Sequence, residues 1–348
     1  MIAAINQAIN LKSTYNIRVI NLSLGRPVYE TYTQDPLCQA VEKAWKAGIV
    51  VVVAAGNYGR DSTYAENGYA TITAPGNDPF VITVGAMNTM GTPSRADDVI
   101  ASYSSKGPTL YDHIVKPDLV APGNRIISLY TAGTGLSTSY SSNEIPYSLY
   151  QVNGNTTQSS TYYRLSGTSM AAPMVSGTVA LMLQQHSSLT PDQVKARLMK
   201  TAYKNLRPYS SATDPVTGIT YNSQSDIFTV GAGYLDIQAA LSNTDLAPST
   251  VGCALSPTVA KTTSSKGVTT IALVNGTGVV WGSGVVWGSG VVWGSNVLVN
   301  GSGVVWGSGV VWGSNVQGSG VVWGSGVVWG TSSTDAGEAT AVTINGEN

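Results

Sequence analysis

The chain has 348 residues, a formal net charge of −1 and a sequence pI of about 6.1. This length allows one large α/β domain with an appendage. Charged residues make up only 11%, against about 25% in a typical soluble domain, and offer no basic surface for nucleic acid. No apolar run is long enough to predict a transmembrane segment. Cys38 and Cys253 match no metal-ligand spacing and are expected to be separate thiols.

The first third of the chain predicts helices and strands in alternation. Apolar residues recur at helical spacing from Ile2 to Ile9, so we expect the chain to begin inside an amphipathic helix. The run at 49–57 is almost continuously apolar and β-branched, which is typical of a central parallel strand covered on both faces. Together the segments predict a three-layer, doubly wound, mostly parallel α/β sheet. Strands are expected at 18–25, 49–57 and 79–86, and a helix at 36–47.

The middle of the chain predicts a loop followed by two helices. Residues 128–163 are rich in Ser, Thr, Tyr and Asn, and we expect a long polar loop there. A helix should open at Ser169 and run to about His186, apolar nearly all round and therefore buried, with Pro173 in its first turn. The sequence Thr-Pro-Asp-Gln from Thr190 predicts a second helix with a capping box. The globular part should close near residue 242.

Three segments carry residue types suited to nucleophilic attack on a carbonyl. Ser169 lies at a helix opening, where unpaired N–H groups and the positive helix end can stabilise a developing oxyanion. Asn57 follows a buried strand, a place where open sheets present ligand-binding groups. The strand ending at 23–25 could offer a backbone edge to an extended peptide. The alternatives are a helix N-cap for Ser169, a turn residue for Asn57 and a tight turn at 23–25.

These segments resemble motifs of the subtilisin-like serine proteases. Residues 167–173 (GTSMAAP) are similar to that family's nucleophile motif, 53–57 to its oxyanion-asparagine segment and 20–25 to its substrate-binding strand. The resemblance covers about residues 1–242, with further ordered matches at 101–108, 116–123 and 231–241. It implies a serine endopeptidase acting on peptide or protein through an acyl-enzyme, with Ser169 as nucleophile and Asn57 as oxyanion donor. The substrate-binding residues that it implies are Ser23, Leu24, Gly25, Ala54, Ala55, Gly56, Gly167 and Thr168.

A serine nucleophile needs a base, and the chain has only two histidines. His186 follows Ser169 on the same expected helix, and 17 residues (186 − 169) at 1.5 Å each place it about 25 Å away. His113 precedes the 116–123 segment, which does not supply the base in the resembling family. That family's aspartate and histidine motifs come earlier than anything found here. We therefore expect an N-terminally truncated chain that is inactive alone.

The expected parent protein would carry the missing Asp and His and a secretion signal, and would act outside the cell. The beginning of this chain has no signal-peptide pattern. The alternative is a non-catalytic pseudoprotease or a surface-binding protein. Members of the resembling family often bind calcium, but the Asp and Asn residues here form no recognisable calcium loop. No metal or cofactor is therefore assigned.

The C-terminal third changes character. We expect a linker with a short β stretch at 243–275, a repeat region at 276–330 and a polar tail at 331–348. Apart from Trp45, every one of the eight tryptophans lies in a Val-Val-Trp-Gly repeat, and no charge occurs from Gly267 to Thr334. Three interpretations stay open: a low-complexity, flexible or β-prone segment, a compact β-solenoid or hairpin stack, and tryptophan faces that bind polysaccharide or another cell surface.

Overall fold

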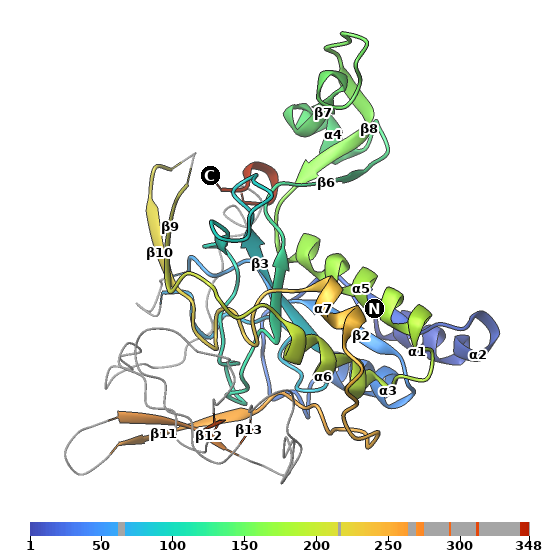
Figure 1. Cartoon of the computed structure of the whole chain (residues 1–348), viewed down its shortest axis with the longest axis vertical. Helices are drawn as coiled ribbons and strands as arrows, with labels where there is room; N and C mark the ends of the chain where they lie inside the picture. The colour runs from blue at the N-terminus through green and yellow to red at the C-terminus, as the bar shows by residue number, and fades with distance from the viewer. Residues whose placement is uncertain are drawn as a thin grey trace.

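The computed structural model describes residues 1–61, 67–214, 217–263, 269–274, 292–293, 311–312 and 342–347. Its centre is a five-stranded sheet in which β1, β2, β3 and β5 run parallel and β4 pairs antiparallel with β3 (Figure 1). The expected α/β class with a mostly parallel sheet is confirmed. The strands are β1 (Val19–Leu22), β2 (Val50–Ala54), β3 (Ile82–Asn88), β4 (Val99–Ile100) and β5 (Leu119–Pro122).

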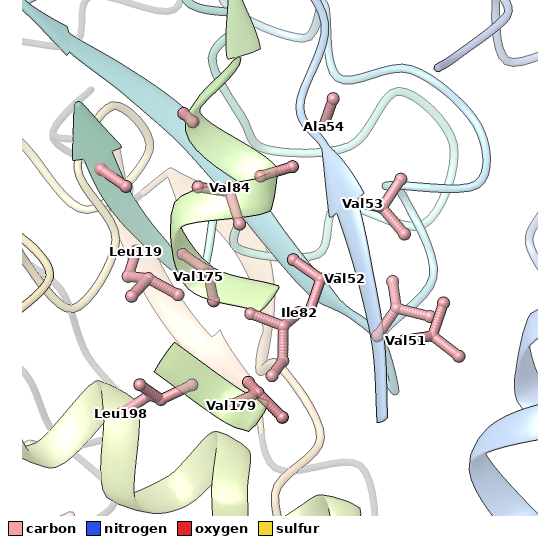
Figure 2. Close-up of a cluster of buried hydrophobic side chains, with 14 of the residues drawn as sticks. Val51, Val52, Val53, Ala54, Ile82, Val84, Leu119, Val175, Val179 and Leu198 are labelled. Atoms are coloured by element: carbon pink, nitrogen blue, oxygen red, sulfur yellow. The ribbon is translucent and has the colours of Figure 1, made fainter. Parts of the chain in front are cut away.

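The core of the domain lies on both faces of β2. Its residues are all at most 2% exposed, and successive side chains of a strand point to opposite faces, so both faces must be covered. Figure 2 shows Val52 on the side of Val175 and Val179, whereas Val51 and Val53 point the other way. Helix α5 (Thr168–Gln185) packs on β1, β2, β3 and β5, and α3 (Pro36–Lys46) packs on β2 and on α1 (Ile2–Asn10).

The beginning of α3 follows directly from its sequence. Asp35 is the N-cap, and its carboxylate accepts the backbone N–H groups of Leu37 and Cys38, while Pro36 occupies the first helical position, where no N–H is needed. The helix ends before Gly48, which has a φ of 82°. A short helix, α2 (Lys12–Tyr15), connects α1 to β1. The helix expected at the beginning of the chain is confirmed as α1.

Helix α5 differs from the expectation in two respects. Pro173 lies five residues after Thr168, the first helical residue, so it is inside the helix and not in its first turn. The helix is also not buried all round, because one stripe faces solvent and Leu181 on it is 44% exposed. Most residues of this stripe are small. The sequence of the helix therefore looks apolar on this face too, although these residues expose little apolar surface to solvent. The stripe consists of Pro173, Gly177, Ala180, Leu181 and Gln184.

The expectation of an irregular polar loop at 128–163 is wrong. This region forms an arm that stands out from the body (Figure 1), with a three-stranded antiparallel sheet in the order β6–β8–β7. Tyrosine rings pack together in the arm, as in the pairs Tyr130–Tyr163 and Tyr150–Tyr162, whose centroids lie 5.0 and 5.1 Å apart. The elements are β6 (Ile126–Leu129), α4 (Gly135–Ser139), the 3₁₀ turns Ser141–Asn143 and Tyr147–Leu149, β7 (Glu144–Pro146) and β8 (Gln158–Leu165).

Helix α6 (Pro191–Thr201) confirms the predicted capping box, because Thr190 and Gln193 bond each other's backbone N–H groups. The hairpin β9 (Tyr209–Thr213) and β10 (Thr220–Gln224) and helix α7 (Ile237–Ser242) follow. The chain after residue 242 stays packed on the domain: Ala247 and Ala254 are buried against Ala196 of α6. Strand β11 (Thr258–Thr263) pairs with β12 (Thr269–Val274).

The tryptophan repeats lie outside the described residues, apart from β13 (Val292–Trp293) and β14 (Val311–Trp312), which pair in parallel. The three interpretations of the repeats therefore stay predictions. Residues 342–345 form a helical turn. No helix in the described part of the chain has the length and apolarity needed to cross a membrane. Cys38 and Cys253 are both free thiols, as the sequence predicts.

Candidate active site

The first turn of α5 meets the carboxyl ends of the parallel strands. Ser169 is the second residue of this helix, and Gly167 is its N-cap. The Gly167 N–H donates to the carbonyl of Gly123, just beyond β5, at 2.8 Å. Gly167 has a φ of 143°, and a Cβ there would lie 3.0 Å from Nδ2 of Asn57. A glycine at position 167 is therefore required both by its backbone conformation and by the close approach of Asn57.

Asn57 is oriented by Thr168. Its Oδ1 accepts the Thr168 backbone N–H at 2.9 Å and the Thr168 hydroxyl at 3.0 Å. The same hydroxyl accepts the N–H of Gly56 at 3.1 Å. Because a backbone N–H can only donate, these bonds fix which atom of the amide is the oxygen. Across the described residues, neither Nδ2 of Asn57 nor the N–H of Ser169 donates to a protein acceptor.

Ser169 and Ser23 exchange two hydrogen bonds. The Ser169 hydroxyl donates to the Ser23 carbonyl at 3.3 Å, and the Ser23 hydroxyl donates to the Ser169 carbonyl at 2.6 Å. In a regular helix the carbonyl of residue 169 would accept the N–H of residue 173, but Pro173 has none. The Ser23 hydroxyl supplies that missing donor.

Two side chains that the sequence did not single out extend this connection. Nδ2 of Asn21 donates to the Ser23 hydroxyl at 2.9 Å, and the hydroxyl of Ser176 on α5 donates to Oδ1 of Asn21 at 2.8 Å. Asn21 is an exposed residue of β1, where a polar side chain suggests only a solvent-facing position. No motif in the sequence indicates that it bridges a strand and a helix.

The expected substrate-binding residues fall into an accessible set and a buried set. Ser23 and Gly25 are exposed, and Leu24 and Gly56 are half-buried. The two accessible segments are held side by side by Thr73: its N–H donates to the Ala55 carbonyl at 3.0 Å, and a Cβ on Gly25 would lie 2.1 Å from its hydroxyl. The buried residues are Ala54, Ala55, Gly167 and Thr168.

Neither histidine lies beside Ser169. His186 is the C-cap of α5, at the opposite end of the helix and about 25 Å away at 1.5 Å per residue. His113 precedes β5, and its carbonyl accepts the N–H of Val259 in β11. The far end of β5, at Gly123, is the end that bonds Gly167, so His113 lies at the opposite edge of the sheet. Within the described ranges the Ser169 hydroxyl bonds only the carbonyl of Ser23.

Two residues of the 116–123 segment belong to a buried cluster of charged side chains. Asp118 pairs with Lys116 at 2.7 Å and with Lys195 of α6 at 3.2 Å, and all three side chains are fully buried. The hydroxyl of Ser256 donates to Asp118 at 2.5 Å. The two ammonium groups hold the pKa of Asp118 below its usual range against the effect of burial. Where the chain is described, no group of three or more His, Cys, Asp or Glu residues is placed to hold a metal ion.

The fold combines a mostly parallel α/β sheet with a serine at a helix N-terminus beyond the strand ends, where a hydroxyl can meet a carbonyl beside unpaired N–H donors. The model of the subtilase family, Peptidase S8, matches residues 1–233. The chain belongs to the subtilase family of serine proteases.

The chain is similar to several individual proteins. Serine protease AprX of Bacillus subtilis (strain 168) is 44% identical over 184 residues, which are 52% of this chain and 37% of AprX. Subtilisin DY of Bacillus licheniformis is 32% identical over 238 residues, 68% of this chain and 62% of that protein. The chain thus spans less than two thirds of both. Among solved structures, fervidolysin of Fervidobacterium pennivorans is similar with a TM-score of 0.47 and 26% identity, over 76% of this chain and 31% of fervidolysin.

Proposed function

We propose that this chain carries the nucleophile and the oxyanion-binding groups of a serine endopeptidase. The Ser169 hydroxyl oxygen attacks the carbonyl carbon of the scissile peptide bond, and the carbonyl oxygen takes the negative charge. Collapse of this intermediate releases the amine and leaves an acyl-enzyme, which water then hydrolyses. The substrate is an extended peptide or protein segment met outside the cell, lying along the accessible backbone of 23–25.

One observation carries the proposal. Thr168 binds Oδ1 of Asn57, which leaves Nδ2 to donate, and the N–H of Ser169 is an unpaired donor of a helix first turn. Two such donors beside a serine hydroxyl are the arrangement that stabilises a developing oxyanion, and one donor is worth about 10²–10³ in kcat.

The proposal includes inactivity of the chain alone. Attack requires the Ser169 proton to move to a base, and the histidines lie at the far end of α5 and at the opposite edge of the sheet. The base and the carboxylate that orients it are therefore supplied by residues outside this chain. The Ser169 hydroxyl donates its hydrogen bond to the Ser23 carbonyl. A carbonyl is not basic enough to take up the proton, so this bond does not activate the nucleophile.

The test uses two conditions and a matched variant. Alone, the chain should show no turnover of a chromogenic peptide amide and only slow labelling by a fluorophosphonate. Co-expressed with the upstream portion of a subtilase that carries the Asp and His motifs, it should gain amidase activity. Ser169→Ala should abolish that activity, and Asn57→Ala should lower kcat about 10²–10³-fold with a smaller change in KM. Rapid labelling of Ser169 in the isolated chain would refute the missing base.

A further inference from the structure

A short segment near the end of the chain returns to the peptidase domain. Residues 342–347, of which 342–345 form a helical turn, lie beside the base of the arm (Figure 1). Val342, Ile344 and Glu347 are only 1%, 6% and 1% exposed. An acidic side chain that is buried to this extent must be paired. The residues that pair with it lie more than 200 positions earlier in the chain.

The carboxylate of Glu347 enters a site built from buried donors. The Ser102 N–H donates to both of its oxygens, at 3.0 and 3.1 Å, and the Ser102 hydroxyl donates at 2.5 Å. Nη2 of Arg60 donates at 3.2 Å. Ser102 and Arg60 are 2% and 5% exposed. The N–H and hydroxyl of Ser102 and the guanidinium of Arg60 thus converge on the carboxylate, and hydrogen bonds to a charged group of this kind are the strong ones.

The backbone of the same segment is recognised as well. Asn124 forms a reciprocal pair with Glu347: its Nδ2 donates to the Glu347 carbonyl at 2.8 Å, and its Oδ1 accepts the Glu347 N–H at 2.9 Å. Nδ2 of Asn143, in the arm, donates to the carbonyl of Ile344 at 2.6 Å. Because these side-chain amides bond the backbone groups of particular residues, they fix the register in which the segment binds.

The segment also bonds the strand that leads to the nucleophile. The N–H of Ser166 donates to the Thr343 carbonyl at 2.9 Å, and Ser166 immediately precedes Gly167. Gly346 packs against the same residue, because a Cβ there would lie 2.5 Å from the Ser166 hydroxyl. Holding Ser166 in place restrains the backbone that continues to Ser169.

We propose that Arg60, Ser102, Asn124, Asn143 and Ser166 form a docking site for an acidic peptide, and that its occupant is residues 342–347 of the same chain. Docking restrains Ser166, which makes Glu347 a positioning residue for the turn that carries Ser169. Only this effect on Ser169 rests on the function proposed above.

Arg60 has partners besides Glu347. Nη1 of Arg60 also pairs with Asp214 at 2.5 Å, and its guanidinium lies 4.7 Å from the ring centroid of Tyr221 in β10. Loss of Glu347 therefore leaves Arg60 with a counter-charge. We expect variants of the segment to fold and to undock.

Amide hydrogen exchange of the full chain tests the proposal without any need for catalysis. Glu347→Ala removes the carboxylate, and Gly346→Val blocks docking sterically at a φ of 65° without a change in charge. In both variants the amides of Ser102 and Ser166 should exchange at least about tenfold faster. Asp245→Ala, which removes an exposed carboxylate paired with Lys200, is the matched control and should leave both rates unchanged.

The amide of Ala55, which donates to Val84 inside the sheet, reports on the fold and should keep its wild-type rate. Wild-type exchange at Ser102 and Ser166 in both variants would overturn the proposal. Faster exchange at Ala55 in both variants would overturn it too, because residues 342–347 would then be part of the general fold and not a docked segment.

Discussion

Ser23 and Ser169 are joined by two hydrogen bonds of opposite direction, although 146 positions separate them. The shorter bond, at 2.6 Å, runs from the Ser23 hydroxyl to the helical carbonyl that Pro173 leaves without a donor. The longer bond holds the Ser169 hydroxyl against a backbone carbonyl. The segment at 23–25 therefore helps to build the helix that carries the proposed nucleophile, in addition to its expected role in binding peptide.

Replacing Ser23 by alanine should destabilise the chain by about 1 kcal/mol, because the Ser169 carbonyl loses its donor. Pro173→Ala restores a backbone N–H at the helical position that serves the same carbonyl. The loss caused by Ser23→Ala should therefore be smaller in the Pro173→Ala background than in the wild type. Urea unfolding of the four proteins measures this coupling. Strictly additive effects would show that Ser23 does not replace the missing helical donor.

Thr168→Val should impair the orientation of Asn57, since the hydroxyl both donates to Oδ1 and accepts the N–H of Gly56. In the complemented enzyme, we expect kcat to fall about tenfold while KM changes little, as for a loss confined to the transition state. Thr168→Ser keeps the hydroxyl and should retain most of the activity. A loss in Thr168→Ser as large as that in Thr168→Val would mean that the hydroxyl alone does not account for the role of this position.

The parts of this molecule that the sequence predicts are those with local or periodic signals. The β-branched run at 49–57 predicts β2, and Thr190 with Gln193 predicts the beginning of α6. The arm at 128–163 has no such signal, because its longest strand reads QSSTYYRL, without alternation of apolar and polar residues, and tyrosine rings pack on one another there. The docking of Glu347 has none either, since its partner Arg60 lies 287 positions away.

Asp118→Ala should destabilise the domain by about 3–5 kcal/mol, because it leaves two buried ammonium groups without their carboxylate. Ser256→Ala should cost about 1 kcal/mol through loss of one hydrogen bond to the same carboxylate. The exposed pair Lys200–Asp245 provides the contrast: Asp245→Asn should change stability by no more than about 1 kcal/mol. Chemical denaturation monitored by far-ultraviolet circular dichroism ranks the three. A small effect of Asp118→Ala would mean that the lysines find other partners or lose their protons.

Lys204 should make stability increase with pH above neutrality. Its ammonium donates to the carbonyls of Met199 and Ala232, and burial lowers its pKa from 10.5 to about 7. Between these values the unfolded chain binds a proton that the folded chain does not, so raising the pH favours the folded state. From pH 7 to pH 9 this group should add up to about 2.7 kcal/mol.

The matched variant is Lys204→Met, which keeps an unbranched side chain and removes the titrating group. Urea unfolding at pH 7, 8 and 9 should show a steeper increase in the free energy of unfolding for the wild type than for Lys204→Met. Parallel pH profiles for the two proteins would contradict the lowered pKa of Lys204 and assign the pH dependence to other groups.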